Sequence, residues 1–158
     1  MKMRLAVLAL ALIAATPSSA HADLTAFLGR NSADSDRSLT RGFAFGVSML
    51  VIGFEFEYAN SSEDLTELRP SLRTTSGNIS VQTFGLPFQL YGTTGGGLYR
   101  ERLGNDEETA ALLNFGGGIK IPVGGPMRAR IDYRVFNLKG HPRHDTIQRI
   151  YAGLNLAF

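Results

Sequence analysis

The sequence predicts an all-β protein, an eight-stranded antiparallel up-and-down barrel that crosses a membrane with its strands. Three observations lead to this fold class. Large apolar residues alternate with small or polar ones in several segments, which is the period of a strand with one apolar and one polar side. After the N-terminal segment no apolar run is long enough to cross a membrane as a helix, and only helices and closed barrels satisfy every backbone group in lipid. The last alternating segment stops on an aromatic residue, Phe158.

Residues 1–22 have the three parts of a secretory signal peptide. Basic Lys2 and Arg4 precede an apolar run over 5–15, and the stretch Ala20-His21-Ala22 predicts cleavage before Asp23. The apolar run of about 11 residues is shorter than the roughly 20 that a spanning helix needs. We therefore expect residues 1–22 to be removed and residues 23–158 to form a single barrel domain in a bacterial outer membrane.

The composition excludes several classes of function. The chain has no cysteine, so a disulfide framework, a thiolate metal site and a lipid-modified N-terminal cysteine are all excluded. Sixteen basic residues face 14 acidic ones, and Lys2 and Arg4 account for the excess of two. The mature chain is therefore balanced in charge, and nucleic acid is not an expected partner.

The alternation is clearest in two segments. In 52–58 the even positions are apolar, whereas Gly53, Glu55 and Glu57 occupy the odd ones. In 150–158 the even positions are again apolar. Extending the same criterion along the chain predicts eight strands, at about residues 24–29, 42–49, 52–59, 78–86, 89–102, 110–122, 128–138 and 147–158.

Every second connection between these strands is expected to be short. The tight turns fall near Leu50-Val51, Pro87-Phe88 and Gly124-Gly125-Pro126, and the last of these is the firmest turn signal. Such alternation is typical of outer-membrane barrels, with tight turns on the periplasmic side and longer loops outside. We expect both ends of the mature chain on the periplasmic side. The expected outward-facing surface is the polar segment 60–77, with contributions from 30–41 and 139–146.

Several stretches of the second half support a family resemblance. Residues 90–99 are aromatic and glycine-rich, 114–119 and 131–134 alternate in polarity, and the chain ends Tyr151-Ala152-Gly153-Leu154-Asn155-Leu156-Ala157-Phe158. From Gln89 to Phe158 the sequence resembles the outer-membrane β-barrel domain family that includes OmpA-type and OmpX-type barrels.

The resemblance implies an assembly signal at the C-terminus. Its residues are Tyr151, Gly153, Leu156 and Phe158. It also implies outer-membrane lipid as a partner, together with the barrel assembly machinery and periplasmic chaperones during biogenesis.

Charged residues on the predicted inward face are the most informative set of side chains. They are Glu55, Glu57, Lys120, Arg130, Asp132, Arg134 and Arg149. An eight-stranded barrel is just wide enough for side chains to fill it, and isolated buried charges are too costly to keep. We therefore expect a hydrogen-bonded, ion-paired core. The alternative is that these charges line a narrow path for ions.

Other candidate sites are weaker. His141 and His144 lie three residues apart in an expected loop without a third ligand of fixed geometry, so they are expected to be solvated rather than to bind a metal or act as a base. The glycine runs 95–97 and 116–118 precede no helix and no Lys-Ser/Thr pair, so they are expected to let strands bend and to leave room for inward neighbours. We expect no catalytic, cofactor or metal site.

The sequence favours a non-enzymatic barrel with a structural or adhesion-like role through its loops, and it leaves the extracellular ligand open. One alternative is a narrow pore for ions or solutes. Another is an enzyme that modifies lipid A, although the Ser with a His or carboxylate partner that such chemistry needs has no His-x-Ser counterpart here. A third is a soluble periplasmic barrel with an internal ligand cavity, which requires large apolar residues to point inward.

Overall fold

The computed structural model describes residues 20–34, 36–64, 66 and 68–158. Most of the expected signal peptide, residues 1–19, lies outside the described residues. The first strand begins at Ala20, so the expected cleavage before Asp23 falls three residues into it. Within the described residues, we find no helix with the length and apolar character to cross a lipid bilayer.

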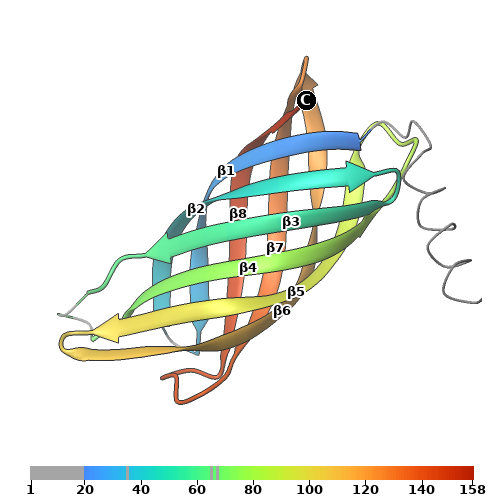
Figure 1. Ribbon diagram of the computed structural model, residues 1–158. Coiled ribbons are helices and arrows are strands. Elements are labelled where there is room, and N and C mark those ends of the chain that lie inside the picture. The colour runs from blue at the N-terminus through green and yellow to red at the C-terminus, as the bar shows by residue number, and fades with distance from the viewer. Residues whose placement is uncertain (1–19, 35, 65, 67) are drawn as a thin grey trace, which may run out of the picture.

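Eight antiparallel strands form one closed barrel (Figure 1). They are β1 (Ala20–Ala33), β2 (Asp36–Met49), β3 (Ile52–Ser61), β4 (Ser71–Gln82), β5 (Gln89–Leu103), β6 (Asp106–Gly124), β7 (Met127–Leu138) and β8 (Thr146–Ala157). Each strand pairs with its neighbours in sequence, and β1 closes the barrel by pairing with β8, where Leu24 lies opposite Leu156. The predicted fold class is confirmed.

The two ends of the barrel differ in what they carry. The terminal end holds the connections 50–51, 83–88 and 125–126 together with both described chain ends, and Ala22 and Phe158 exchange backbone hydrogen bonds of 2.8 and 2.9 Å. The loop end holds the connections 34–35, 62–70, 104–105 and 139–145. In Figure 1 the hairpin of β5 and β6 extends furthest at the loop end.

The fourth strand lies earlier than the sequence predicts. It covers Ser71–Gln82 rather than 78–86, so the loop expected over 60–77 shrinks to 62–70. Over 71–76 Leu72 is the only apolar residue. Because the predicted strands were found from an apolar face, a strand that is polar on both faces escaped detection.

The expected alternation of short and long connections is also wrong. Strands β1 and β2 are longer than predicted, so the loop expected over 30–41 is reduced to residues 34–35. The connection 83–88 is longer than the two-residue turn expected near Pro87-Phe88, whereas the turns at 50–51 and 125–126 lie where the sequence placed them. Leu50 and Gly125 adopt positive φ angles of 53° and 54° in those turns.

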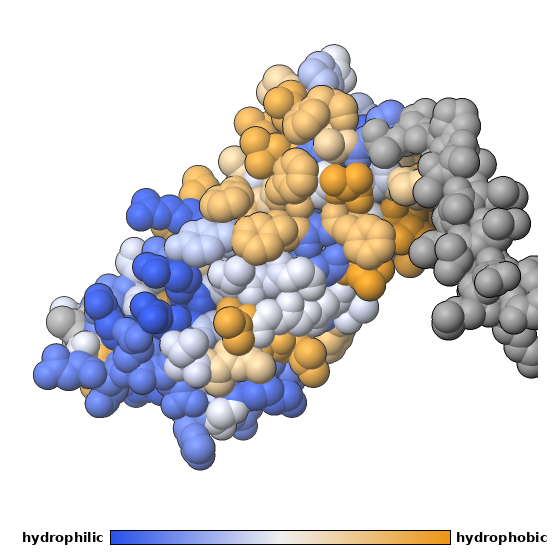
Figure 2. All heavy atoms as spheres, in the orientation of Figure 1, coloured by the Kyte–Doolittle hydropathy of each residue, from blue (hydrophilic) through white to orange (hydrophobic). Residues whose placement is uncertain are grey.

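The outside of the barrel is apolar over the terminal half. Phe43, Phe45, Phe54 and Phe56 project outward from β2 and β3 and are between 45% and 61% exposed. We call the outward set the apolar belt; it comprises Leu24, Leu28, Phe43, Phe45, Val47, Phe54, Phe56, Ile79, Val81, Leu90, Phe115, Ile121, Ile131, Ile150, Leu154 and Leu156. Figure 2 shows hydrophobic residues gathered over this half and mainly hydrophilic residues toward the loop end.

Exposed arginines follow the apolar belt toward the loop end. This arginine band consists of Arg30, Arg37, Arg41, Arg73, Arg100 and Arg102. All six arginines occupy strand positions in the same outward phase as the belt residues. The change from apolar to cationic residues along the strands therefore divides the outer surface into two zones.

Candidate functional site

Arg130 of β7 holds several acceptors inside the barrel. Its two terminal nitrogens lie 2.5 and 3.2 Å from the two carboxylate oxygens of Glu55 on β3. Its Nη2 also lies 3.1 Å from Oδ2 of Asp132, and its Nε donates to the hydroxyl of Tyr91 at 2.7 Å. The Tyr91 hydroxyl in turn donates to Asp132. This guanidinium therefore forms a bidentate ion pair, the strong form of charge-assisted hydrogen bonding.

Arg134 joins the three acidic groups of the interior. Its Nη2 lies 2.6 Å from Glu55, its Nη1 lies 3.2 Å from Glu57, and its Nε lies 2.9 Å from Asp132. Arg149 of β8 then continues the chain of contacts, with Nη1 3.0 Å from Glu57. The remaining nitrogens of Arg149 donate to the side chains of Asn31 at 2.8 Å and Thr74 at 3.0 Å.

These contacts connect six of the seven charged residues that the sequence placed on the inward face. We call the six the charge network: Glu55, Glu57, Arg130, Asp132, Arg134 and Arg149. The network holds three positive and three negative groups, and no side chain in it is more than 9% exposed. Charges buried to this degree persist only when they are paired, and here each has at least one partner of opposite sign.

Lys120, the seventh residue, lies apart from the charge network. Its Nζ is 2.6 Å from Oδ2 of Asp23, and the two side chains are 8% and 9% exposed. Asp23 was missed as an interior residue because the expected first strand began at Leu24. Its inward phase, shared with buried Thr25 and Phe27, was the available signal.

Two glycines of the run 116–118 make room for the network. A Cβ on Gly116 would lie 2.9 Å from Cγ of Arg134, and a Cβ on Gly118 would lie 2.5 Å from the hydroxyl oxygen of Tyr91. Real Cβ atoms do not approach other atoms so closely. These glycines therefore let β6 run alongside large inward side chains of its neighbours.

The interior changes character toward the loop end. A cluster of buried apolar side chains, the loop-end cluster, consists of Ala33, Leu72, Tyr99, Leu112, Phe136, Leu138 and Ile147. Arg149 of the charge network lies over the ring of Phe136, 4.4 Å from its centroid. Sequence reasoning missed this cluster, although the inward phase of β7 changes from charged at Arg134 to apolar at Phe136 and Leu138. That change within one strand was the signal.

The four residues of the expected assembly signal do not share one face. Tyr151 points inward, where its ring stacks on Phe27 at 4.0 Å between centroids and its hydroxyl donates to Glu57 at 3.4 Å. Gly153 is partly buried, and a Cβ there would lie 2.8 Å from Cβ of Phe27. Leu156 and Phe158 are 43% and 65% exposed. Tyr151 and Gly153 are thus placed for packing inside the barrel, and Leu156 and Phe158 are placed for contact with its surroundings.

The two loop histidines lie in different environments. His144 is not simply solvated, since its ring nitrogens lie 3.4 Å from Asp34 and 3.2 Å from Asp36 and its side chain is only 23% exposed. His141 is exposed, and its backbone N–H donates to Glu108 at 2.6 Å. Among the described residues, no group of three or more His, Cys, Asp or Glu side chains is arranged to hold a metal ion.

Neither a protein-family model nor a curated protein matches the sequence. The fold of the described chain, by contrast, is similar to solved barrels. Neisserial surface protein A (NspA) matches with a TM-score of 0.71 at 14% identity, covering 89% of this chain and 98% of NspA. The N-terminal β-barrel domain of OprF from Pseudomonas aeruginosa gives 0.63 at 16%, covering 86% and 97%. Ail, the attachment invasion locus protein of Yersinia pestis, gives 0.57 at 14%, covering 90% and 100%.

The chain has the fold of these small barrels. Ail is an outer membrane protein, and the outer membrane enzyme PagL shares the fold as well, with a TM-score of 0.53 at 12% identity over 85% of this chain and 98% of PagL. Because proteins with this fold include an enzyme, the function has to be argued from the side chains.

Proposed function

We propose that this chain is exported and inserted into a bacterial outer membrane as a non-enzymatic barrel, with a structural or adhesion-like role at its loop end. The observation that carries the proposal is the arrangement of polarity. In the terminal half, the apolar belt covers the outside and the charge network fills the inside. Toward the loop end, the arginine band lies outside and the loop-end cluster lies inside.

This arrangement fits a barrel of which one half lies in lipid and the other in water. A barrel in lipid turns apolar side chains outward and polar ones inward, whereas a soluble barrel does the reverse. An internal ligand cavity would need an open, largely apolar interior in the same half. There the interior is occupied by paired charges, which favours the membrane barrel over a soluble periplasmic one.

The contacts of the titratable groups favour a role without catalysis. Glu55, Glu57 and Asp132 each accept from arginine, and the ring nitrogens of His144 lie against Asp34 and Asp36. Ser-His chemistry needs a hydroxyl within hydrogen-bond reach of the base, and in the described part of the chain His144 is occupied by carboxylates instead. Mass spectrometry of lipid A from cells with and without the protein tests this point, and a changed acyl pattern would contradict it.

The filled interior also favours a closed barrel over a pore. The three guanidinium groups of the charge network are at most 1% exposed, and the loop-end cluster lies between them and the loop end. The expected result in planar bilayers is no steady single-channel opening. Steady openings that change on neutralising Glu55 or Arg134 would support the pore instead.

Membrane location is tested by fractionating cells that express the full chain. We expect the protein in the outer-membrane fraction, with different gel migration before and after boiling, as folded barrels show. Recovery in the soluble periplasm would overturn the proposal.

The adhesion-like role is tested separately, by adherence of expressing bacteria to cultured epithelial cells. The comparison is a variant in which 62–70 and 139–145 are replaced by Gly/Ser segments of equal length. Lower adherence of this variant with unchanged gel migration supports a loop-end role. If cells that express the unmodified chain adhere no better than non-expressing cells, only the structural role remains.

A further inference from the structure

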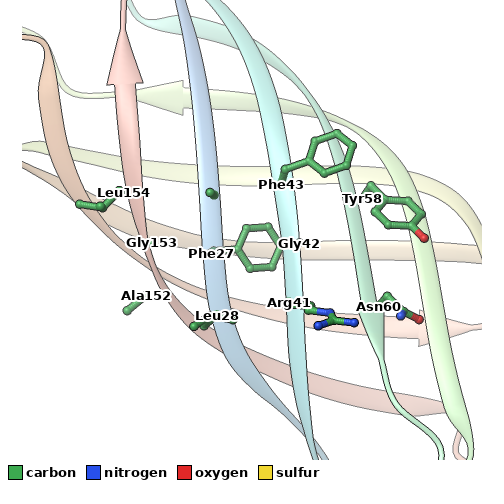
Figure 3. Close-up of a pocket in the computed structure, with 11 residues that line it drawn as sticks. Phe27, Leu28, Arg41, Gly42, Phe43, Tyr58, Asn60, Ala152, Gly153 and Leu154 are labelled. Atoms are coloured by element: carbon green, nitrogen blue, oxygen red, sulfur yellow. The ribbon is translucent and has the colours of Figure 1, made fainter.

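An apolar groove runs along the outer wall of the barrel over β1 (Figure 3). Its volume is about 850 Å³. Small residues on three adjacent strands form part of it, namely Ala26 on β1, Gly42 on β2 and Ala152 on β8, and Leu28 and Leu154 border it. Ala26 and Ala152 lie in the outward phase of the apolar belt, where neighbouring positions carry large side chains, so the wall is hollowed at these two residues.

Polar residues stand where the groove approaches the loop end. Arg41 and Asn60 are the two strongly polar side chains that line it, and in Figure 3 the guanidinium of Arg41 extends toward Asn60. The two residues are direct cross-strand partners on β2 and β3. The groove thus joins an apolar trough to a cationic edge, which is the layout that an anionic amphiphile requires.

The cationic edge continues across the next two strands. Asn60 pairs with Arg73 on β4, and Arg73 pairs with Arg100 on β5. Directly opposite residues on one face have Cβ atoms about 4.5–5.5 Å apart, and like charges in that position are destabilising. Arg100 is partly compensated by Glu107 at 3.3 Å. Among the described residues, Arg41 and Arg73 have no carboxylate within ion-pair distance.

Two polar hollows flank this row. One, of about 290 Å³, is lined by Asn60, Arg73, Arg100 and Arg102 with several serines and the acidic Glu63 and Glu107. The other, of about 270 Å³, is lined by Arg41 and Asn60 with Arg69, Glu63 and Asp64 among others. Asn60 therefore lines the apolar groove and both hollows, so the three form one continuous surface.

We propose that this surface binds a phosphate-bearing lipid of the membrane leaflet at the loop end. The acyl chain lies in the apolar groove, and the phosphate lies on Arg41 and Arg73, where guanidinium groups donate charge-assisted hydrogen bonds to phosphate oxygens. The proposal rests on the membrane insertion proposed above. The ligand is a lipid because a free anion would leave the apolar groove empty. The row of Arg41 and Arg73 also lies at the border of the apolar belt, where headgroups lie.

The test uses the full protein extracted from membranes and held in detergent micelles. Equal amounts of phosphatidic acid and of diacylglycerol with the same acyl chains are added, and bound lipid is counted by native mass spectrometry. We expect a preference for phosphatidic acid of about tenfold or more, the change that about 1.4 kcal/mol gives. In Arg41→Gln/Arg73→Gln the preference is expected to disappear. Lys139→Gln/Arg143→Gln removes the same charge from loop 139–145 and is expected to keep the preference.

A third variant tests the groove itself. Ala152→Leu fills the trough with a side chain that suits a lipid-facing surface, so we expect lower occupancy by phosphatidic acid with unchanged folding. Equal binding of the two lipids by the unmodified protein, or a preference that survives in Arg41→Gln/Arg73→Gln, overturns the proposal. So does full competition by inorganic phosphate together with normal lipid binding by Ala152→Leu, which assigns the row to a free anion.

A sulfated polysaccharide is the other polyanion to distinguish. Binding of heparin that depends on Arg41 and Arg73, without any preference between the two lipids, would assign the row to that class and overturn the lipid site. Gel migration of each sample before and after boiling keeps the two proposals apart. A barrel that remains heat-modifiable but does not prefer phosphatidic acid fails only the lipid proposal.

Discussion

Replacing Glu57 with Gln tests whether the charge network stabilises the barrel. The amide keeps the shape of the carboxyl group but removes the negative charge that Arg134 and Arg149 share at 3.2 and 3.0 Å. The three side chains are at most 1% exposed, so water does not replace the lost acceptor. The substitution leaves three buried cations opposite two buried anions.

The magnitude follows from the two lost ionic contacts. Glu57→Gln leaves one acceptor oxygen where the carboxylate had two, so one guanidinium keeps a hydrogen bond to the side chain and the other faces an N–H donor. The lost hydrogen bond to a charged group contributes about 1.5–3 kcal/mol. The unpaired positive charge increases this loss of stability further, toward the roughly 3–5 kcal/mol that breaking a buried ion pair costs. We expect the free energy of unfolding to fall by about 3 kcal/mol.

The assay is urea unfolding of the barrel in lipid vesicles, followed by circular dichroism because the chain has no tryptophan. The control is Glu107→Gln, which removes a carboxylate paired with Arg100 at 3.3 Å where both side chains are at least 42% exposed. An exposed pair of this kind contributes roughly 0–1 kcal/mol. If Glu57→Gln lost no more stability than this control, the charge network would not be what holds the interior together.

Three further predictions concern assembly, close packing and the apolar interior. Deleting Phe158 should lower the amount of assembled, heat-modifiable barrel in the outer membrane far more than His144→Ala does, and equal amounts would argue against a terminal assembly signal. Gly118→Ala should destabilise the barrel by about 1–3 kcal/mol in urea titrations because its Cβ meets the Tyr91 hydroxyl. The control is Gly92→Ala, whose Cβ meets only a backbone oxygen at 3.9 Å and whose stability should stay within about 0.5 kcal/mol of the parent. Similar losses for both variants would contradict the packing argument. Leu112→Ala should cost about 2–5 kcal/mol as a core truncation, and a loss below about 0.5 kcal/mol would show that the loop-end cluster is not a packed core.

The sequence predicted the barrel because an apolar outward face makes strands visible. Phe54 and Phe56, with Glu55 between them, distinguish the two faces of β3 from the sequence of that strand alone. Where the belt gives way to the arginine band, that contrast disappears. Ser71–Ser76 is polar on both faces apart from Leu72, so the beginning of β4 was assigned to a loop. The same cause shortened the loop ends of β1 and β2 in the prediction.

The sequence predicted which residues form the charge network but not which of them contact one another. The period of two was enough to place Glu57, Arg134 and Arg149 on one face of their strands. Which of them meet depends on how β3, β7 and β8 face one another across the closed barrel, and the spacing of residues along the chain does not contain that information. The groove on the outer wall could not be predicted for a similar reason, since Ala26, Gly42 and Ala152 become neighbours only through strand pairing.

The outer surface changes from apolar to cationic along the barrel, and this has a consequence for the chain while it is in water before the proposed insertion. The half that carries the loop-end cluster packs those side chains inside the barrel, so the cluster does not need lipid to be shielded from water. Under the proposed insertion, the residues that have to be shielded from water before insertion are those of the apolar belt. Under the proposed insertion, the loops of the other half stay in water, so their sequence can change without altering the belt that enters the bilayer.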